Sequence, residues 1–168
     1  EAAGAVPTRA IALSGDARHL DQVQTAFDAA VTELGPVDVA VDVIGEARWG
    51  RTIDLDDTAW DESFDLVLRH FFNLARVAGR HMSDRGTGAL VAIASVSGLR
   101  SAPRHGPYGA AKAGLMSLVR TLAVELGANG VRISLQGHQP FMAAVAAVQD
   151  TMKALREGVP PSKLAQIA

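Results

Sequence analysis

Hydrophobic and polar positions divide the start of the chain into short apolar runs and a longer segment of helical period. Residues 9–15 and 37–45 are apolar runs, and between them the segment 20–34 has apolar side chains at every third or fourth position. Short apolar runs predict buried strands, and the three-to-four spacing predicts an amphipathic helix. We therefore predict a strand, a helix and a second strand in this order.

The same alternation continues along the rest of the sequence. The remaining predicted elements are one helix or two in series at 57–82, a strand at 89–95, a helix from about 107 to 127, a strand at 131–135 and a helix at 141–155. The last of these helices forms either part of the core or a lid over a pocket. Alternating strands and helices predict an α/β fold with a parallel sheet, and no repeat or linker divides residues 1–168, so we predict one domain.

Composition and charge exclude several classes of protein. With 168 residues, of which 48% are hydrophobic and 20% charged, the chain is large enough for one packed core. A net charge of -2 without a run of Lys or Arg argues against nucleic-acid and membrane partners. No apolar stretch approaches the roughly 20 residues needed to cross a bilayer. Because the sequence has no cysteine and no paired histidines, we expect a cytoplasmic protein without a metal site.

A tyrosine and a lysine stand one helical turn apart in a segment rich in glycine and alanine. Tyr108 is the only tyrosine of the chain, and Lys112 follows it by four positions, which places both on one helix face. The ammonium and the helix N-terminus both favour the phenolate, so Tyr108 is a candidate acid/base for a carbonyl or carbinol oxygen. Ser95, at the end of a predicted strand, is placed to donate to the same oxygen. For the Tyr–Lys pair alone, a solvated pair on a helix surface is the alternative.

The pattern around these residues resembles the short-chain dehydrogenase/reductase family. Ser95 lies thirteen positions before Tyr108, in the order apolar strand, Ser-x-Ser-Gly, Pro-x-x-x-x-Tyr-x-x-x-Lys-Ala. Further similar segments are GPVDVAVDVIG, which resembles the family's strand and Asn-Asn-Ala-Gly turn, the Trp60-Asp61 pair, TLAVELGANGVRIS and REGVPPSKLAQIA. The resemblance covers nearly the whole chain, and it implies a Rossmann-like doubly wound parallel sheet.

The resemblance also implies an activity and a set of site residues. A member of this family transfers a hydride between NAD or NADP and a secondary alcohol or ketone. By resemblance, Tyr108 is the catalytic acid/base, Lys112 favours the phenolate and binds the nicotinamide ribose, and Ser95 orients the substrate oxygen. Asp16 matches the aspartate that binds the adenine amine, and Gly45 matches the turn glycine that admits the cofactor. A homotetramer or homodimer is the implied assembly.

Several positions depart from the family's pattern. Asp42 stands at the first asparagine of the turn, and the catalytic asparagine of the family falls on Val67, which cannot hold a relay water. His70, one turn further on, is a candidate substitute, with a packed or solvated histidine as the alternative. His138 and Gln139 stand where Pro-Gly usually meets the nicotinamide. These departures motivate an alternative function, in which a catalytically impaired member acts as a binding or assembly partner.

Two parts of the family's fold have no counterpart in this sequence. The chain contains no Gly-rich phosphate turn, residues 9–15 match the third strand, and no final strand follows residue 155. In the strand order 3-2-1-4-5-6, strands 1 and 2 lie between strands 3 and 4. We therefore expect these residues to belong to a longer polypeptide. The alternative is a rearranged sheet in which 9–15 pairs directly with 37–45.

Residues near the predicted site offer weaker indications of the substrate. Trp49 either lines the substrate pocket or packs in the fold. The basic residues Arg100, Arg104 and His105 are candidates for binding an anionic group, with a solvated loop as the alternative. The apolar segment 141–148 matches the position of the family's mobile substrate loop, which favours an apolar portion in the substrate.

Overall fold

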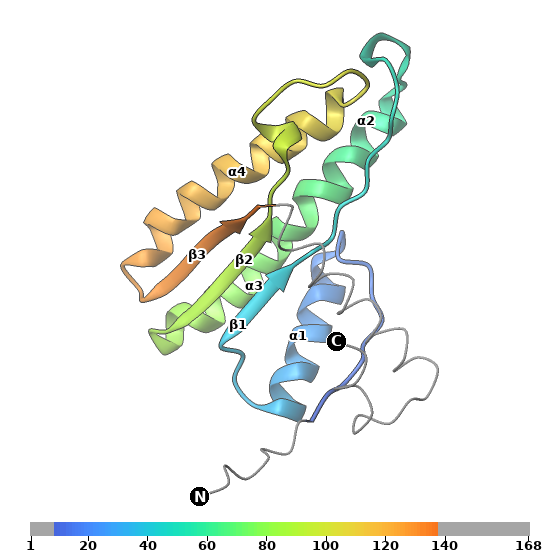
Figure 1. Ribbon diagram of the computed structural model, residues 1–168. Coiled ribbons are helices and arrows are strands. Elements are labelled where there is room, and N and C mark those ends of the chain that lie inside the picture. Colours follow the sequence, from blue (N-terminus) through green and yellow to red (C-terminus); the bar gives the residue numbers. More distant parts are fainter. Residues whose placement is uncertain (1–8, 138–168) are drawn as a thin grey trace, which may run out of the picture.

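The computed structural model describes residues 9–137, in which three parallel strands form a sheet (Figure 1). The strands are β1 (Val39–Asp42), β2 (Gly88–Ile93) and β3 (Val131–Gln136), and they lie side by side in this order. Asp42 is opposite Ala92, and Ile93 is opposite Gln136. The carboxyl ends of all three strands therefore lie at the same edge of the sheet, where open α/β sheets bind ligands.

The helices and turns follow the predicted pattern. They are α1 (Leu20–Leu34), the 3-10 turn η1 (Thr52–Asp54), α2 (Asp57–Phe64), the π-helical turn η2 (Asp65–Arg69), α3 (His70–Arg85), the 3-10 turn η3 (Val96–Gly98) and α4 (Gly106–Gly127). The helices predicted at 20–34, 57–82 and 107–127 are confirmed. The second of these consists of α2 and α3, which are joined without a break through η2.

Local sequence signals explain where these helices begin and end. The carboxylate of Asp56 caps α2 by accepting a hydrogen bond of 2.8 Å from the backbone N–H of Ala59. Helix α1 ends at Gly35, which has φ of 90° and precedes Pro36, and α3 ends at Gly86 in the left-handed conformation with φ of 70°. Residues next to the helix ends therefore set these boundaries, and their types can be recognised in the sequence.

The hydrophobic core lies between the sheet and its helices. Phe71 and Met82 of α3, Leu115 and Val119 of α4, and Leu90 of β2 are buried in one cluster. Burial of each such side chain contributes about 1.5–3 kcal/mol. Because strands β1, β2 and β3 follow one another across the sheet, right-handed crossovers place α3 and α4 on the same face, as Figure 1 shows.

The opposite face of the edge strand is open in residues 9–137. Val39 and Val41 point to this face, with 57% and 48% of their surfaces exposed. Strands of parallel sheets are usually covered on both faces. The α/β class and the parallel, Rossmann-like sheet are confirmed, and the described residues form the portion of that fold with helices on one side.

The strand predicted at 9–15 is wrong. These residues form no ladder, and they lie along α1, where Arg9 forms an ion pair with Glu33 and donates to its carbonyl oxygen over 2.7 Å. A strand requires a partner for its backbone groups, and in the described part of the chain β1 pairs with β2 alone. The direct pairing of 9–15 with 37–45 expected for a rearranged sheet is therefore not observed.

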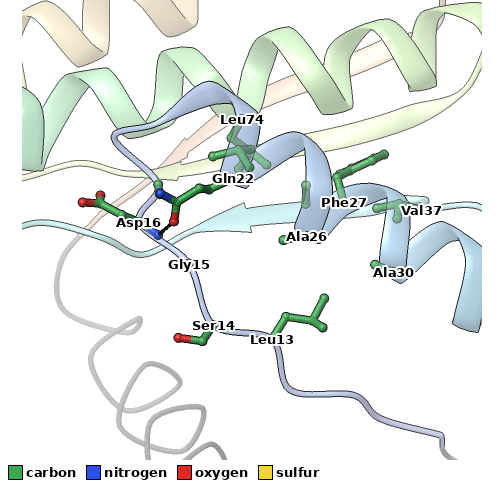
Figure 2. Close-up of a pocket in the computed structure, with 13 residues that line it drawn as sticks. Leu13, Ser14, Gly15, Asp16, Gln22, Ala26, Phe27, Ala30, Val37 and Leu74 are labelled. Carbon is green, nitrogen blue, oxygen red and sulfur yellow. Dashed lines mark hydrogen bonds between the residues drawn. The ribbon is translucent and has the colours of Figure 1, made fainter.

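A cavity of about 360 Å³ separates residues 13–16 from α1 and the edge of β1 (Figure 2). Leu13, Phe27 and Val37 are among its mostly apolar lining residues, and the carboxylate of Asp16 points away from them. None of the predicted catalytic residues lines this cavity. It is thus an apolar gap beside the edge strand and not the candidate reaction site.

Predictions for residues 138–168 lie outside the described part of the chain. They comprise the helix at 141–155, the substrate-loop segment at 141–148 and the replacements His138 and Gln139. Within residues 9–137, no helix is both long enough and apolar enough to span a membrane.

Candidate functional site

Ser95 lies two residues beyond the end of β2 and caps the 3-10 turn η3. It is buried, and its Oγ accepts a hydrogen bond of 3.2 Å from the backbone N–H of Ser97. This bond uses a lone pair of the oxygen, and no acceptor for the hydroxyl proton is found in residues 9–137. Ser95 can therefore donate that proton to another oxygen.

Two glycines allow η3 to pack directly against the backbone of α4. A Cβ atom at Gly98 would stand 2.9 Å from the backbone nitrogen of Ala113, and one at Gly109 would stand 2.9 Å from the carbonyl oxygen of Ser97. Real side chains do not tolerate such contacts with backbone atoms. This contact brings the segment after Ser95 onto the first turns of α4.

Tyr108 and Lys112 lie on these first turns of α4, as their spacing predicts. Lys112 is only 3% exposed, and its Nζ donates a hydrogen bond of 2.7 Å to the carbonyl oxygen of Ile93 at the end of β2. The same Nζ lies 5.8 Å from the centroid of the Tyr108 ring. The structure therefore gathers Ser95, Tyr108 and Lys112 around the carboxyl end of β2.

The environment of Lys112 acts on its pKa in two directions. Burial lowers the pKa, because removal from water disfavours the charged ammonium. The negative charge of Asp42 acts in the opposite direction and is the smaller effect. Lys112 thus loses its proton more readily than a solvated lysine does, and Asp42 limits that change.

Asp42 and His70 form a buried pair beside this lysine. Asp42 ends β1 with 6% of its surface exposed, and His70 begins α3 with 2% exposed. The Nδ1 atom of His70 lies 2.8 Å from Oδ2 of Asp42, and its Nε2 atom lies 3.0 Å from the carbonyl oxygen of Leu66. Of the two alternatives for His70, the structure shows a packed position. Its partner, Asp42, stands where the family has the first asparagine of the turn.

Val67 is fully buried within the π-helical turn η2. Its side chain has no polar atom, so it cannot hold a water as the family's asparagine does. π-helical turns occur often at functional sites, because the extra residue changes which side chains face inward. Here the turn immediately precedes His70 and supplies the Leu66 carbonyl oxygen that His70 contacts.

Gly45 and Asp16, two of the predicted cofactor residues, have different neighbours. A Cβ atom at Gly45 would stand 3.4 Å from Nζ of Lys112, so the turn glycine faces the lysine closely. Asp16 lines a cavity of about 440 Å³ together with Ile44 and His70. One polar cavity therefore connects the loop at Asp16 with the turn after β1.

The Asp16 carboxylate is engaged by the neighbouring Arg18. The Arg18 guanidinium donates to both carboxylate oxygens, at distances between 2.6 and 3.0 Å, and the Arg18 backbone N–H donates to Oδ1 over 3.0 Å. These hydrogen bonds lower the pKa of Asp16 to about 2. Asp16 is therefore ionised at neutral pH, and a carboxylate is a strong acceptor for an amine.

Asn73 holds this loop in place, a role that the sequence did not reveal. Its buried side-chain amide donates hydrogen bonds of 3.0 Å to the carbonyl oxygens of both Ala17 and Arg18. These contacts span more than 50 positions of sequence. In the sequence Asn73 is one of several polar residues in the predicted helix, so no local pattern marked it.

An aromatic wall stands beside Tyr108, consisting of Trp49 and His105. The Trp49 ring lies 4.3 Å from that of His105 and 5.5 Å from that of Tyr108 between centroids. Nδ1 of His105 is 2.8 Å from Oγ of Ser97, which fixes the imidazole, while Trp49 remains 57% exposed. Trp49 therefore packs against two rings with more than half of its surface exposed, and a role in lining a substrate pocket stays a prediction.

The basic residues of the same loop lie in solvent. Arg100 and Arg104 are both exposed, and neither forms an ion pair with a described residue. Arg104 has a positive φ of 67°, and its carbonyl oxygen accepts a hydrogen bond of 3.3 Å from the backbone N–H of Gly50. This bond links the loop before α4 to the segment that carries Trp49.

Comparison with known proteins identifies the class to which this parallel sheet and its edge site belong. A family model described as enoyl-(acyl carrier protein) reductase matches residues 1–159. A probable galactose dehydrogenase of Rhizobium meliloti is 32% identical over 73% of this chain and 48% of its own length. A putative short-chain type dehydrogenase/reductase of Mycolicibacterium smegmatis is 31% identical over 95% of this chain and 59% of its own length.

Solved structures agree with these sequence matches. A putative short-chain dehydrogenase/reductase from Burkholderia xenovorans superposes with a TM-score of 0.70 and 31% identity, over 78% of this chain and 54% of that one. A gluconate 5-dehydrogenase from Burkholderia cenocepacia in complex with NADP and tartrate gives a TM-score of 0.69 and 25% identity. The match covers 74% of this chain and 49% of that one. The parallel sheet and its helices define a Rossmann-like α/β fold. The chain belongs to the short-chain dehydrogenase/reductase family, and it spans about half the length of these relatives.

Proposed function

We propose that the protein containing this chain is an NAD(P)-dependent oxidoreductase that transfers a hydride between a nicotinamide and a secondary alcohol or ketone. The observation that carries the proposal is the position of Lys112, buried beside the Tyr108 ring and bonded to the end of β2. A buried ammonium next to a partly exposed phenol, with the hydroxyl of Ser95 nearby, is an arrangement suited to proton transfer at a substrate oxygen.

Each side chain has a distinct role in the proposed reaction. Tyr108 donates its proton to the substrate oxygen in reduction and accepts it in oxidation. Ser95 donates a hydrogen bond to the same oxygen, because its hydroxyl proton has no acceptor within residues 9–137. The ammonium of Lys112 favours the phenolate that is left behind, since an adjacent positive charge stabilises an anion.

The residues present fit the adenosine and ribose portions of a nicotinamide dinucleotide. Asp16 is ionised and borders a cavity of about 440 Å³, and its carboxylate would accept a hydrogen bond from the adenine amine in addition to those it accepts from Arg18. Lys112 uses one of its three protons on Ile93, and the other two are available for ribose hydroxyls. The dinucleotide supplies hydride transfer when bound. We leave both NAD and NADP as candidates.

We further propose that the substrate carries several hydroxyl groups. The exposed Trp49 ring offers a flat surface for the C–H face of a sugar or polyol, and His105 and Tyr108 place polar atoms at its edge. The relatives named galactose dehydrogenase, D-threitol dehydrogenase and gluconate 5-dehydrogenase act, by their names, on such compounds. The competing class is an acyl thioester, in line with the description of the family model.

The activity is tested by nucleotide binding and turnover in the polypeptide that carries these residues. We expect NADH or NADPH to bind, and a polyol or sugar acid from a panel of alcohols, ketones and 3-oxoacyl thioesters to be turned over. Tyr108→Phe and Ser95→Ala should each abolish most turnover, whereas Ser101→Ala, at an exposed serine in the following loop, should not. Binding of neither nucleotide would refute the proposal.

A second function is favoured by one observation, the buried valine at position 67. Without a polar side chain there, a catalytically impaired member could serve as a binding or assembly partner. Nucleotide binding without turnover of any compound in the panel would support this alternative.

We also propose self-association through the surface of α2, η2, α3 and α4. Phe72 is 42% exposed there and borders a groove lined by Phe64, Leu68 and Leu118. A homodimer or homotetramer formed through this surface would cover these side chains.

A further inference from the structure

Ser97 and His105 form a hydrogen-bonded pair next to the residues that we place on the substrate oxygen. Oγ of Ser97 lies 2.8 Å from Nδ1 of His105, and both side chains are partly exposed. The backbone N–H of Ser97 donates to Oγ of Ser95 over 3.2 Å, and the His105 ring lies 6.4 Å from that of Tyr108 between centroids. The pair therefore borders both Ser95 and Tyr108, yet it takes no part in the proton transfer proposed for them.

Neighbouring residues hold both members of the pair in place. The carbonyl oxygen of Ser97 packs onto α4 at Gly109, where a Cβ atom would stand 2.9 Å away. The backbone N–H of His105 donates to the carbonyl oxygen of Ala102 over 3.2 Å, and the Trp49 ring lies 4.3 Å from the imidazole between centroids. The two side chains are thus fixed before a ligand arrives, which lowers the entropic cost of binding one.

The pair has one hydrogen-bond donor more than it uses. A neutral imidazole carries one N–H and a serine carries one O–H, and the 2.8 Å contact uses one of these two protons. If Ser97 donates, the free donor is Nε2–H of His105, and if Nδ1 donates, it is the Ser97 hydroxyl. Neither side chain has a further hydrogen-bond partner within residues 9–137. One donor is therefore available in both arrangements.

The pair also keeps an acceptor in both arrangements. When Ser97 donates, its oxygen still has free lone pairs, and when Nδ1 donates, Nε2 of His105 has one. A hydroxyl group of a ligand both donates and accepts, so it can use either the donor or the acceptor of the pair. A carboxylate or a thioester carbonyl only accepts. The pair is therefore better matched to an alcohol than to an acid or a thioester.

We propose that Ser97 and His105 are specificity-determining residues that bind a second hydroxyl group of the substrate, on the carbon next to the one that reacts. The proposal rests on the function proposed above and narrows its substrates to vicinal diols and the matching hydroxyketones. Ser95 and Ser97 are in hydrogen-bond contact, so the two oxygens that they bind belong to adjacent carbons. In oxidation the reacting carbon gives its hydride to the nicotinamide and its hydroxyl proton to Tyr108, and the second hydroxyl is unchanged.

A series of three secondary alcohols tests the proposal in the unaltered full-length polypeptide. Vicinal butanediol carries the second hydroxyl, sec-butanol lacks it, and lactate has a carboxylate in its place. We expect kcat/KM for the diol to exceed that for sec-butanol by about tenfold or more, because sec-butanol covers the pair without satisfying it. Equal values for the diol and sec-butanol would overturn the proposal, and so would a preference for lactate over the diol.

Variants then assign the preference to the pair. Ser97→Ala combined with His105→Phe removes both polar side chains, while the backbone N–H to Ser95 and a ring beside Trp49 remain. The ratio of kcat/KM between the diol and sec-butanol is the readout, because a disturbance of Ser95 or Tyr108 slows both substrates alike. We expect this ratio to fall toward one in the double variant and to stay unchanged in Ser101→Ala, an exposed serine of the same loop. A ratio that survives in the double variant would overturn the proposal.

Binding is measured without turnover through the fluorescence of Trp49. Trp60 is the other tryptophan of the chain and packs on Phe64, with 4.9 Å between ring centroids, so Trp60→Phe leaves Trp49 as the reporter. We expect the diol to change this emission at a concentration about tenfold lower than sec-butanol does. Half-saturation at the same concentration for both compounds would count against the pair.

The two readouts separate this proposal from the proposed function. Tighter binding of the diol in a protein that oxidises none of the three alcohols would support the pair and contradict the oxidoreductase activity. Oxidation of the diol and sec-butanol with equal kcat/KM would support that activity and overturn the role of Ser97 and His105.

Discussion

A single methyl group at Gly98 should show whether the contact between η3 and α4 sets the geometry of the candidate site. A Cβ atom at Gly98 would stand 2.9 Å from both the backbone nitrogen of Ala113 and the carbonyl carbon of Lys112. It would also stand 3.1 Å from the carbonyl oxygen of Lys112. All three atoms belong to the backbone of α4, which cannot rotate away as a flexible side chain can.

The size of the effect follows from these distances. Ordinary Cβ contacts begin at 3.4 Å, so Gly98→Ala must widen the contact by about 0.5 Å, the difference from 2.9 Å. Overpacking of this kind costs about 1–3 kcal/mol. In a chain of this size that corresponds to a Tm lower by about 2–12 °C. Because a misplacement of roughly 1 Å can reduce a rate 100-fold, half that displacement of Ser95 from Tyr108 should lower kcat/KM about tenfold.

The assay compares Gly98→Ala with Gly127→Ala at the other end of α4. A Cβ atom at Gly127 would meet nothing within 4 Å, so this control adds the same methyl group without a clash. Thermal unfolding and kcat/KM with the best substrate are measured for both variants. If Gly98→Ala matches the control in both quantities, the close contact does not position Ser95 and the reasoning fails.

Three further results are expected. Asn73→Leu removes two hydrogen bonds to the loop after Asp16. The free energy of unfolding, measured in urea, should therefore fall by about 1–3 kcal/mol, and amide hydrogen exchange should become faster at residues 17–19. The Asp16 carboxyl carbon should titrate in NMR with a midpoint at about 2, and Arg18→Gln should raise this midpoint toward 3.8. The contribution of the Asp16–Arg18 pair to stability is present above about pH 4 and is lost as the pH falls toward 2. An unchanged midpoint in Arg18→Gln would contradict the role of Arg18. Phe72→Glu should shift an oligomer toward monomer in light scattering, and an unchanged mass would exclude this surface.

Most elements of the fold could be predicted because their signals are local. The helix at Leu20–Leu34 combines a clear apolar period with Gly35-Pro36 at its end, and the structure has these bounds. The strand predicted at 37–45 is confirmed but shortened to Val39–Asp42, since only those residues have ladder partners in β2. Residues 9–15 have an equally strong apolar pattern and form no strand, because pairing depends on neighbours that a local pattern does not contain.

Some features of the candidate site could likewise be predicted from local signals, whereas others depend on the fold. Tyr108 and Lys112 were found from helical spacing, and Ser95 from its place after a buried strand. The link between them, which is the packing of Gly98 onto α4, depends on three-dimensional contact and could not be derived from the sequence. Asn73 was missed for the same reason, since its partners are more than 50 positions away.

His70 shows how a departure from a family pattern can have a structural explanation. Val67 alone indicated a lost polar contact, and Asp42 alone indicated a changed turn. In the structure the π-helical turn Asp65–Arg69 precedes an inward-facing His70, and the imidazole meets the Asp42 carboxylate at 2.8 Å. A histidine without a buried acid, or an acid without a donor, would each leave an unpaired polar group in the interior, which costs about 1–3 kcal/mol. Asp42 and His70 are therefore coupled, and changing either residue alone should destabilise the site more than changing both.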